Sequence, residues 1–111
     1  MGAHTSECNS AVISFNTTGD NTVISSPSSG PIRVHGIWFT VDAATLITFK
    51  GGNGSSAAAI SGAFDLTAPG SSQTLQINDE PYFYCAPGVN FIMNQSGTAN
   101  VRGTVYYTAG G

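Results

Sequence analysis

The chain has 111 residues, of which 41% are hydrophobic, and this is enough for one domain with one core. Only 8% of the residues are charged, against roughly 25% in an average soluble protein, and the formal net charge is -3. This composition excludes intrinsic disorder, and three basic residues are too few for a nucleic-acid partner or for an anionic membrane surface.

Residues 1–10 show no periodicity and are predicted to form an extended N-terminal arm, which is followed by a β-sandwich domain over residues 11–109. The arm has neither the basic nor the apolar region of a signal peptide, so we expect synthesis without export. No apolar run reaches the roughly 18 residues of a membrane span. Cys8 and Cys85 are too few for a disulfide framework or a zinc site, and a bond between them is left open.

Apolar and polar residues alternate in short segments along the rest of the chain, which is the pattern of half-buried β-strands. The expected strands are 11–15, 21–25, 32–42, 45–50, 57–66, 74–78, 82–85, 91–94 and 100–108. Turn residues separate these segments at intervals of roughly 8 to 12 residues. We therefore predict an all-β fold, a single antiparallel β-sandwich of eight or nine short strands, and a jelly roll suits this strand number best.

The apolar pattern is irregular in two of these strands. The strand over 32–42 is the longest apolar run, and its alternation changes phase at Gly36, where a bulge or bend costs least. Trp38 then faces away from Phe39. The segment 57–66 holds three alanines that also suit a helix, but the common parity of its large apolar residues favours a strand.

The sequence offers few groups for catalysis. His35 lies within a strand and is interpreted as a hydrogen-bonded structural residue, while the carboxylates fall mostly at predicted turns. Asp79 and Glu80 are neighbours at a bend, where acids cap the turn or face solvent instead of flanking a glycosidic bond. The sequence therefore predicts no enzyme, no metal site and no cofactor.

Aromatic side chains are the more promising binding groups. Trp38 and Tyr84 could form a flat platform for a sugar ring, whose face suits an aromatic plane. The favoured interpretation is that Trp38 and Phe83 fill the core while the tyrosines cover its rim. A tyrosine on the outer face is then expected at a subunit interface, where this residue is enriched.

The order of several segments resembles the small β-sandwich head decoration, or cement, proteins of tailed bacteriophages. The segments that carry the resemblance are residues 32–39, 43–50, 60–66, 68–70, 78–83 and 101–107. The resemblance implies a structural virion protein that binds the outer capsid surface as a homotrimer and stabilises the shell. Its partners would be copies of itself and the major capsid protein, and it would be made in the host cytoplasm.

No capsid-contact motif is matched, so the candidate interface residues come from the sequence pattern alone. They are Arg33, His35, Asp79, Glu80, Tyr82 and Tyr106. The alternative function is a carbohydrate- or receptor-binding β-sandwich, such as a fibre tip or a lectin-like module. In that case Trp38 and Tyr84 would form the sugar platform.

Overall fold

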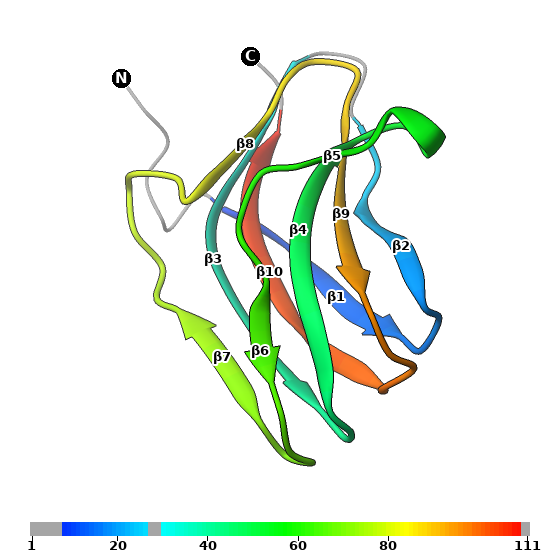
Figure 1. Ribbon diagram of the computed structural model, residues 1–111. Helices are drawn as coiled ribbons and strands as arrows, with labels where there is room; N and C mark the ends of the chain where they lie inside the picture. The colour runs from blue at the N-terminus through cyan, green and yellow to red at the C-terminus, as the bar shows by residue number, and fades with distance from the viewer. Residues whose placement is uncertain (1–7, 27–29, 110–111) are drawn as a thin grey trace.

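The computed structural model describes residues 8–26 and 30–109, and this part of the chain consists mainly of β-strands (Figure 1). The elements are β1 (Asn9–Phe15), β2 (Gly19–Ile24), β3 (Ile32–Val41), β4 (Thr45–Gly52), the 3-10 helix η2 (Gly54–Ser56), β5 (Ala58–Ala59), β6 (Phe64–Leu66), β7 (Ser72–Leu75), β8 (Phe83–Cys85), β9 (Asn90–Gln95) and β10 (Val101–Ala109). The predicted all-β class is confirmed. Residues 1–7, which hold most of the predicted arm, lie outside the described residues, and β1 already begins at Asn9.

The strands form two antiparallel sheets packed face to face (Figure 1). Sheet A has the order β1-β10-β3, and β7 and β8 both pair with the far side of β3. Sheet B has the order β2-β9-β4, and β5 and β6 both pair with the far side of β4. The predicted antiparallel β-sandwich is therefore confirmed, while the jelly-roll topology stays a prediction.

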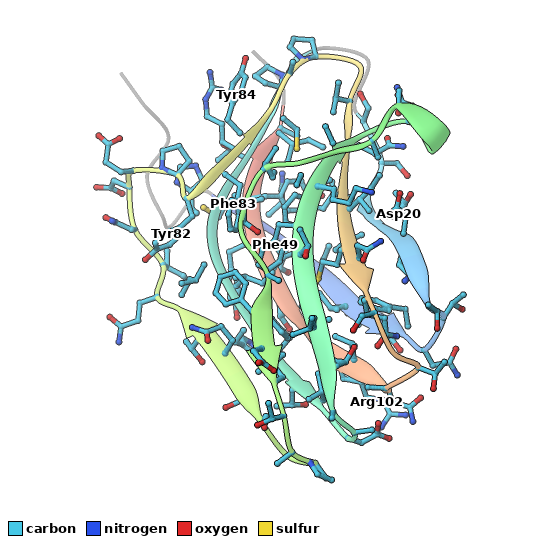
Figure 2. The ribbon with its side chains drawn as sticks, in the orientation of Figure 1. Asp20, Phe49, Tyr82, Phe83, Tyr84 and Arg102 are labelled. Carbon is cyan, nitrogen blue, oxygen red and sulfur yellow. The ribbon has the colours of Figure 1, made fainter. Side chains whose placement is uncertain are left out.

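Phe49 of β4 lies at the centre of the core between the two sheets and is fully buried. Its ring centroid is 4.7 Å from that of Phe83 and 5.7 Å from that of Phe91. The rings of Phe39 and Phe64 meet it edge to face, at 6.0 and 5.4 Å. Phe83 belongs to sheet A and Phe49 to sheet B, so this contact joins the sheets, and Figure 2 shows the two residues close together.

The predicted irregularity at Gly36 is confirmed as a bulge in β3. Tyr106 pairs with Gly36 while the next residue, Tyr107, pairs with Val34, which leaves His35 as the extra residue. A bulge places one additional residue on one strand and changes which positions face inward. Inward positions therefore fall on even numbers before the bulge and on odd numbers after it, as the phase change predicted.

Two sequence predictions about individual segments are wrong. Segment 57–66 is not one strand, because the chain leaves the ladder between β5 and β6, where the backbone N–H of Phe49 donates to the Ser61 hydroxyl at 3.1 Å. A side chain thus replaces a backbone partner there. The strand expected over 74–78 ends early, because β7 stops at Leu75 and the following residues cross over the bulge, where Ile77 is 45% exposed.

That crossing depends on the missing side chain of Gly36. A Cβ atom at this position would lie 2.9 Å from the side chain of Ile77 and 3.0 Å from its Cα. The backbone N–H of Asn78 donates to the carbonyl of His35 at 2.9 Å and so fastens the crossing segment to β3. Gly36 is therefore needed for a close approach of two backbones.

Candidate interaction surface on sheet A

Side chains that point away from the core form a continuous outer face on sheet A. The strand register places one row across the whole sheet, running through Val12, Thr104, Trp38 and Thr74. The next row runs through Ser14, Arg102, Thr40 and Ser72. Val12 is 78% exposed and Trp38 is 41% exposed, so large apolar groups remain open to solvent on the edge strand β1 and on the central strand β3.

Trp38 was expected in the core, and the structure corrects this prediction. After the bulge the odd-numbered residues of β3 face inward, so Trp38 between Ile37 and Phe39 must face outward. Phe83, which was predicted together with it, does pack against the core. A tryptophan that is 41% exposed leaves a large aromatic surface open to solvent on this face.

The charge on sheet A differs in sign from the charge of the chain as a whole. The five strands of sheet A contain two charged residues, Arg33 and Arg102, and no carboxylate, which gives +2 on a chain of net charge -3. At one end of the sandwich, hydrogen bonds from Asn100 lower the pKa of the Asp42 carboxyl, and the charge of Arg102 contributes in the same direction. The middle of the outer face therefore has no negative side chain on its strands.

The net charge of the strands in sheet B is negative, because they contain two carboxylates, Asp20 and Asp65, and one ammonium group, Lys50. The Lys50 ammonium lies 2.9 Å from the Asp20 carboxylate, and this is the single ion pair found within residues 8–26 and 30–109. The amide of Asn94 also donates to Asp20 at 2.7 Å. Hydrogen bonds from Asn94 and Lys50 lower the pKa of Asp20, so its carboxylate is already satisfied within sheet B.

Arg33 lies at the other end of the outer face from Arg102. Its guanidinium carbon is 5.5 Å from the ring centroid of Tyr84, the residue paired with it on β8. A cation–π contact at an exposed site contributes about 0.5 to 1 kcal/mol and holds both side chains against the sheet. Figure 2 shows Tyr84 and Arg102 at opposite ends of the sandwich, so the two arginines lie far apart on this face.

His35 does not lie on this surface, although it was a candidate interface residue. Its side chain is 3% exposed, with Nδ1 at 3.0 Å from the carbonyl of Asn78 and Nε2 at 3.2 Å from the hydroxyl of Thr108. Both ring nitrogens therefore have partners inside the protein. The structure agrees with the interpretation of His35 as a hydrogen-bonded structural residue and corrects its assignment to an interface.

Asp79, Glu80 and Tyr82 lie in the exposed segment between β7 and β8, and Tyr106 is half-buried on the outer face. The Tyr82 hydroxyl donates to the carbonyl of Gln76 at 2.7 Å, and its backbone N–H donates to Val34 at 2.8 Å. Tyr82 therefore closes its own segment onto β3. The structure places these four residues at the surface and leaves their role in an interface a prediction.

Trp38 and Tyr84 are exposed on the same face but do not form a single platform. Tyr84 pairs with Arg33, which is four register steps along β3 from Trp38 once the bulge is discounted. At about 3.3 Å per step the two rings are separated by roughly 13 Å along the strand direction. This distance is too great for both rings to stack on one sugar, although an oligosaccharide could span it.

Sequence reasoning missed Val12 as a surface residue. Ala11, Ile13 and Phe15 share one face of β1, and the structure packs all three on the core. A valine between them must then face outward. The alternation along β1 already indicates that Val12 faces outward. Its place on the exposed face becomes clear only when the neighbouring strand is known.

Cys85 is buried, and its burial raises the pKa of the thiol to about 11. The thiol is free, so the bond to Cys8 that the sequence left open is not formed. Within the described residues no group of three or more His, Cys, Asp or Glu side chains could hold a metal ion. In that same part of the chain, no helix is long and apolar enough to cross a membrane.

The fold and this face define an antiparallel β-sandwich with an aromatic and weakly basic sheet surface. No protein-family model, curated protein or solved structure matches the chain. The resemblance to decoration proteins therefore stays a prediction from the sequence.

Proposed function

We propose that this chain is a structural protein of a virus particle, a decoration protein that lies on the outer surface of the capsid and contacts the major capsid protein. The observation that carries the proposal is the outer face of sheet A, which exposes Val12 and Trp38 among uncharged residues. A surface with few charges loses little hydration free energy when another protein covers it. Exposed aromatic residues supply contact area at a low entropic cost.

The two arginines of sheet A would favour a partner surface that is acidic. Neither Arg33 nor Arg102 forms an ion pair with a carboxylate of the described residues. Both are therefore able to pair with acidic side chains on another protein, where the planar guanidinium binds a carboxylate through two hydrogen bonds. In this proposal the capsid supplies those acids.

The proposed action is mechanical. Each copy makes a modest contact, and the contact repeats over the shell, so that many weak interactions together resist deformation. The resemblance also implies three copies about one axis, and cyclic symmetry would cover further exposed surface. A mass measurement in solution and on the particle tests this number.

Co-sedimentation with undecorated capsids tests the proposal. We expect the wild-type protein to sediment with the capsids and Trp38→Ala to need about tenfold more protein for the same occupancy, because one buried aromatic anchor is lost. Leu46→Ala is the matched control, since Leu46 is 40% exposed on the outer face of sheet B. Wild-type protein that stays in the supernatant would contradict the proposed function, whereas equal binding of Trp38→Ala would contradict the choice of face alone.

The exposure of Trp38 and Tyr84 on one face supports a second candidate, a module that binds an oligosaccharide. A glycan array with the wild-type protein tests it directly. Binding that disappears in both Trp38→Ala and Tyr84→Ala, while both variants remain folded, would favour this function. Loss in one variant alone would indicate a smaller sugar site.

A further inference from the structure

The four edges of the two sheets differ in how well they are protected against pairing with another strand. Edge strands expose unpaired backbone N–H and C=O groups, and proteins usually block them with charges, proline, bulges or very short strands. Sheet A ends at β1 on one side and at β7 and β8 on the other. Sheet B ends at β2 on one side and at β5 and β6 on the other.

Three of these edges carry such protection. β7 and β8 have 4 and 3 residues, and the segment between them contains Asp79, Glu80 and Pro81. β5 and β6 have 2 and 3 residues. β2 carries Asp20, and its register shifts between Thr22 and Ile24.

β1 has none of these features. It runs for 7 residues, its pairing with β10 is regular throughout, and it contains no charge, no proline and no glycine. Among the described residues no strand pairs with its other side. Val12 at its centre is the most exposed large apolar side chain of the described chain, at 78%.

We propose that β1 is a strand-addition site whose occupant is β1 of a second copy of this chain. The two strands run antiparallel about a twofold axis, and the axis that overlaps all 7 residues passes through Val12. The outer faces of sheet A in the two copies then join into one continuous surface. This inference depends neither on a capsid partner nor on the three copies that the resemblance implies.

The sequence of β1 is complementary to itself in this register. On the outer side, Val12 lies opposite Val12 of the second copy, and Ser10 lies opposite Ser14. On the inner side the small Ala11 lies opposite the larger Ile13, and Asn9 lies opposite Phe15. No pair brings together like charges, which would destabilise an antiparallel pair of strands.

If the twofold axis passed between two residues, each inward side chain of one copy would lie opposite an outward side chain of the other. The axis must therefore pass through a residue. Centring on Ala11 or Ile13 would shorten the overlap and lose backbone hydrogen bonds. Val12 is therefore the position at which the register can be tested.

Cysteine cross-linking in a Cys8→Ser background tests this register. Opposite residues in an antiparallel pair have Cα atoms about 4.5 to 5.5 Å apart, within reach of a disulfide. We expect Val12→Cys to form a covalent dimer under mild oxidation on a non-reducing gel. Ser10→Cys is the matched control, because its two copies would lie about 14 Å apart.

A second measurement uses charge at the same position. Val12→Lys places two ammonium groups opposite each other at the axis, and we expect the dissociation constant of self-association to rise about tenfold or more. Thr74→Lys is the matched control, since Thr74 is exposed in the same row at the far edge of sheet A. Both variants change exposed residues, so each should fold.

Three results would overturn the proposal. They are cross-linking of Ser10→Cys as fast as Val12→Cys, a wild-type protein that is monomeric at every concentration, and equal self-association of Val12→Lys and wild type. A capsid-binding protein that fails these tests keeps its proposed function. Conversely, a dimer through β1 that does not bind capsids leaves this inference intact.

Discussion

Asp42 and Asn100 join the β3–β4 turn to the start of β10 through two hydrogen bonds. The backbone N–H of Asn100 donates to Oδ1 of Asp42 at 2.7 Å, and its side-chain amide donates to Oδ2 at 2.6 Å. Since β3 and β10 are neighbours in sheet A, this contact fixes the end of the central strand pair.

These hydrogen bonds predict a loss of stability in acid. The side-chain and backbone bonds from Asn100 lower the pKa of Asp42 from 3.8. A group whose pKa is lower in the folded state stabilises the protein above its unfolded pKa, and this contribution disappears as the pH falls through the folded value. We expect the free energy of unfolding to fall below about pH 4, and less steeply in Asp42→Asn.

Urea unfolding of the wild type and Asp42→Asn at neutral pH and in acid measures this effect. Asp65→Asn is the matched control, because Asp65 is exposed on β6 and no hydrogen bond to its carboxylate is found in the described structure. Equal pH profiles for wild type and Asp42→Asn would contradict the prediction. Asp20 is expected to add to the acid sensitivity in the same direction, since its pKa is also lowered.

Cys85 should resist thiol reagents in the folded protein. Burial raises its pKa to about 11, so at pH 8 only about one thiol in a thousand is ionised, and the thiolate is the reactive form. In a Cys8→Ser variant we expect a colorimetric thiol reagent to react with Cys85 only as fast as the protein unfolds. Rapid reaction in native buffer, at the rate seen in denaturant, would show that Cys85 is accessible.

Gly103 should not tolerate a side chain. An alanine Cβ at this position of β10 would collide with the carbonyl oxygen of Trp38 and lie 2.7 Å from the Cα of Phe39. Both contacts are with backbone, which cannot move without disturbing the β3–β10 pairing. We expect Gly103→Ala to lower the free energy of unfolding by more than about 2 kcal/mol.

Gly62→Ala provides the comparison for Gly103→Ala in denaturant unfolding. No atom lies within 4 Å of a Cβ built at Gly62. This variant should therefore be neutral, or stabilised by a few tenths of a kcal/mol through the unfolded chain (about 0.5 at most). Similar stabilities of the two variants would contradict the close approach at Gly103.

Among the aromatic residues, truncation of Phe49 should cause the largest loss of unfolding free energy. Its ring contacts four other phenylalanines and is fully buried, so Phe49→Ala removes the centre of the core. We expect a loss of about 3 to 5 kcal/mol in unfolding free energy. Leu46→Ala, at an exposed position three residues earlier on β4, should cost less than about 1 kcal/mol in the same experiment.

Much of the fold is predictable from local pattern. Alternation with a period of two locates most of the strands, and the phase change at Gly36 locates the bulge. It fails over 57–66, where the Ser61 side chain takes the place of a backbone partner. The alternation pattern also fails at Ile77, because the backbone there crosses over Gly36 instead of continuing β7.

The candidate surface is less predictable than the fold. The sequence singled out Trp38, Arg33 and Tyr106, and all three belong to strands of sheet A. It did not predict that Val12 and Trp38 share one row, since Thr104 of β10 lies between them. It also placed His35 at an interface, whereas the bulge buries this residue between Asn78 and Thr108.

The sequence by itself therefore determined the all-β class, the low charge and the division of each strand into two faces. These properties are local, because a side chain's face depends only on its position along its own strand. Only the tertiary structure decided which strands are neighbours, which edge is left without protection, and that sheet A carries both arginines but no acid. Those properties depend on pairing between distant segments such as β1 and β10, and strand alternation contains no information about the partner.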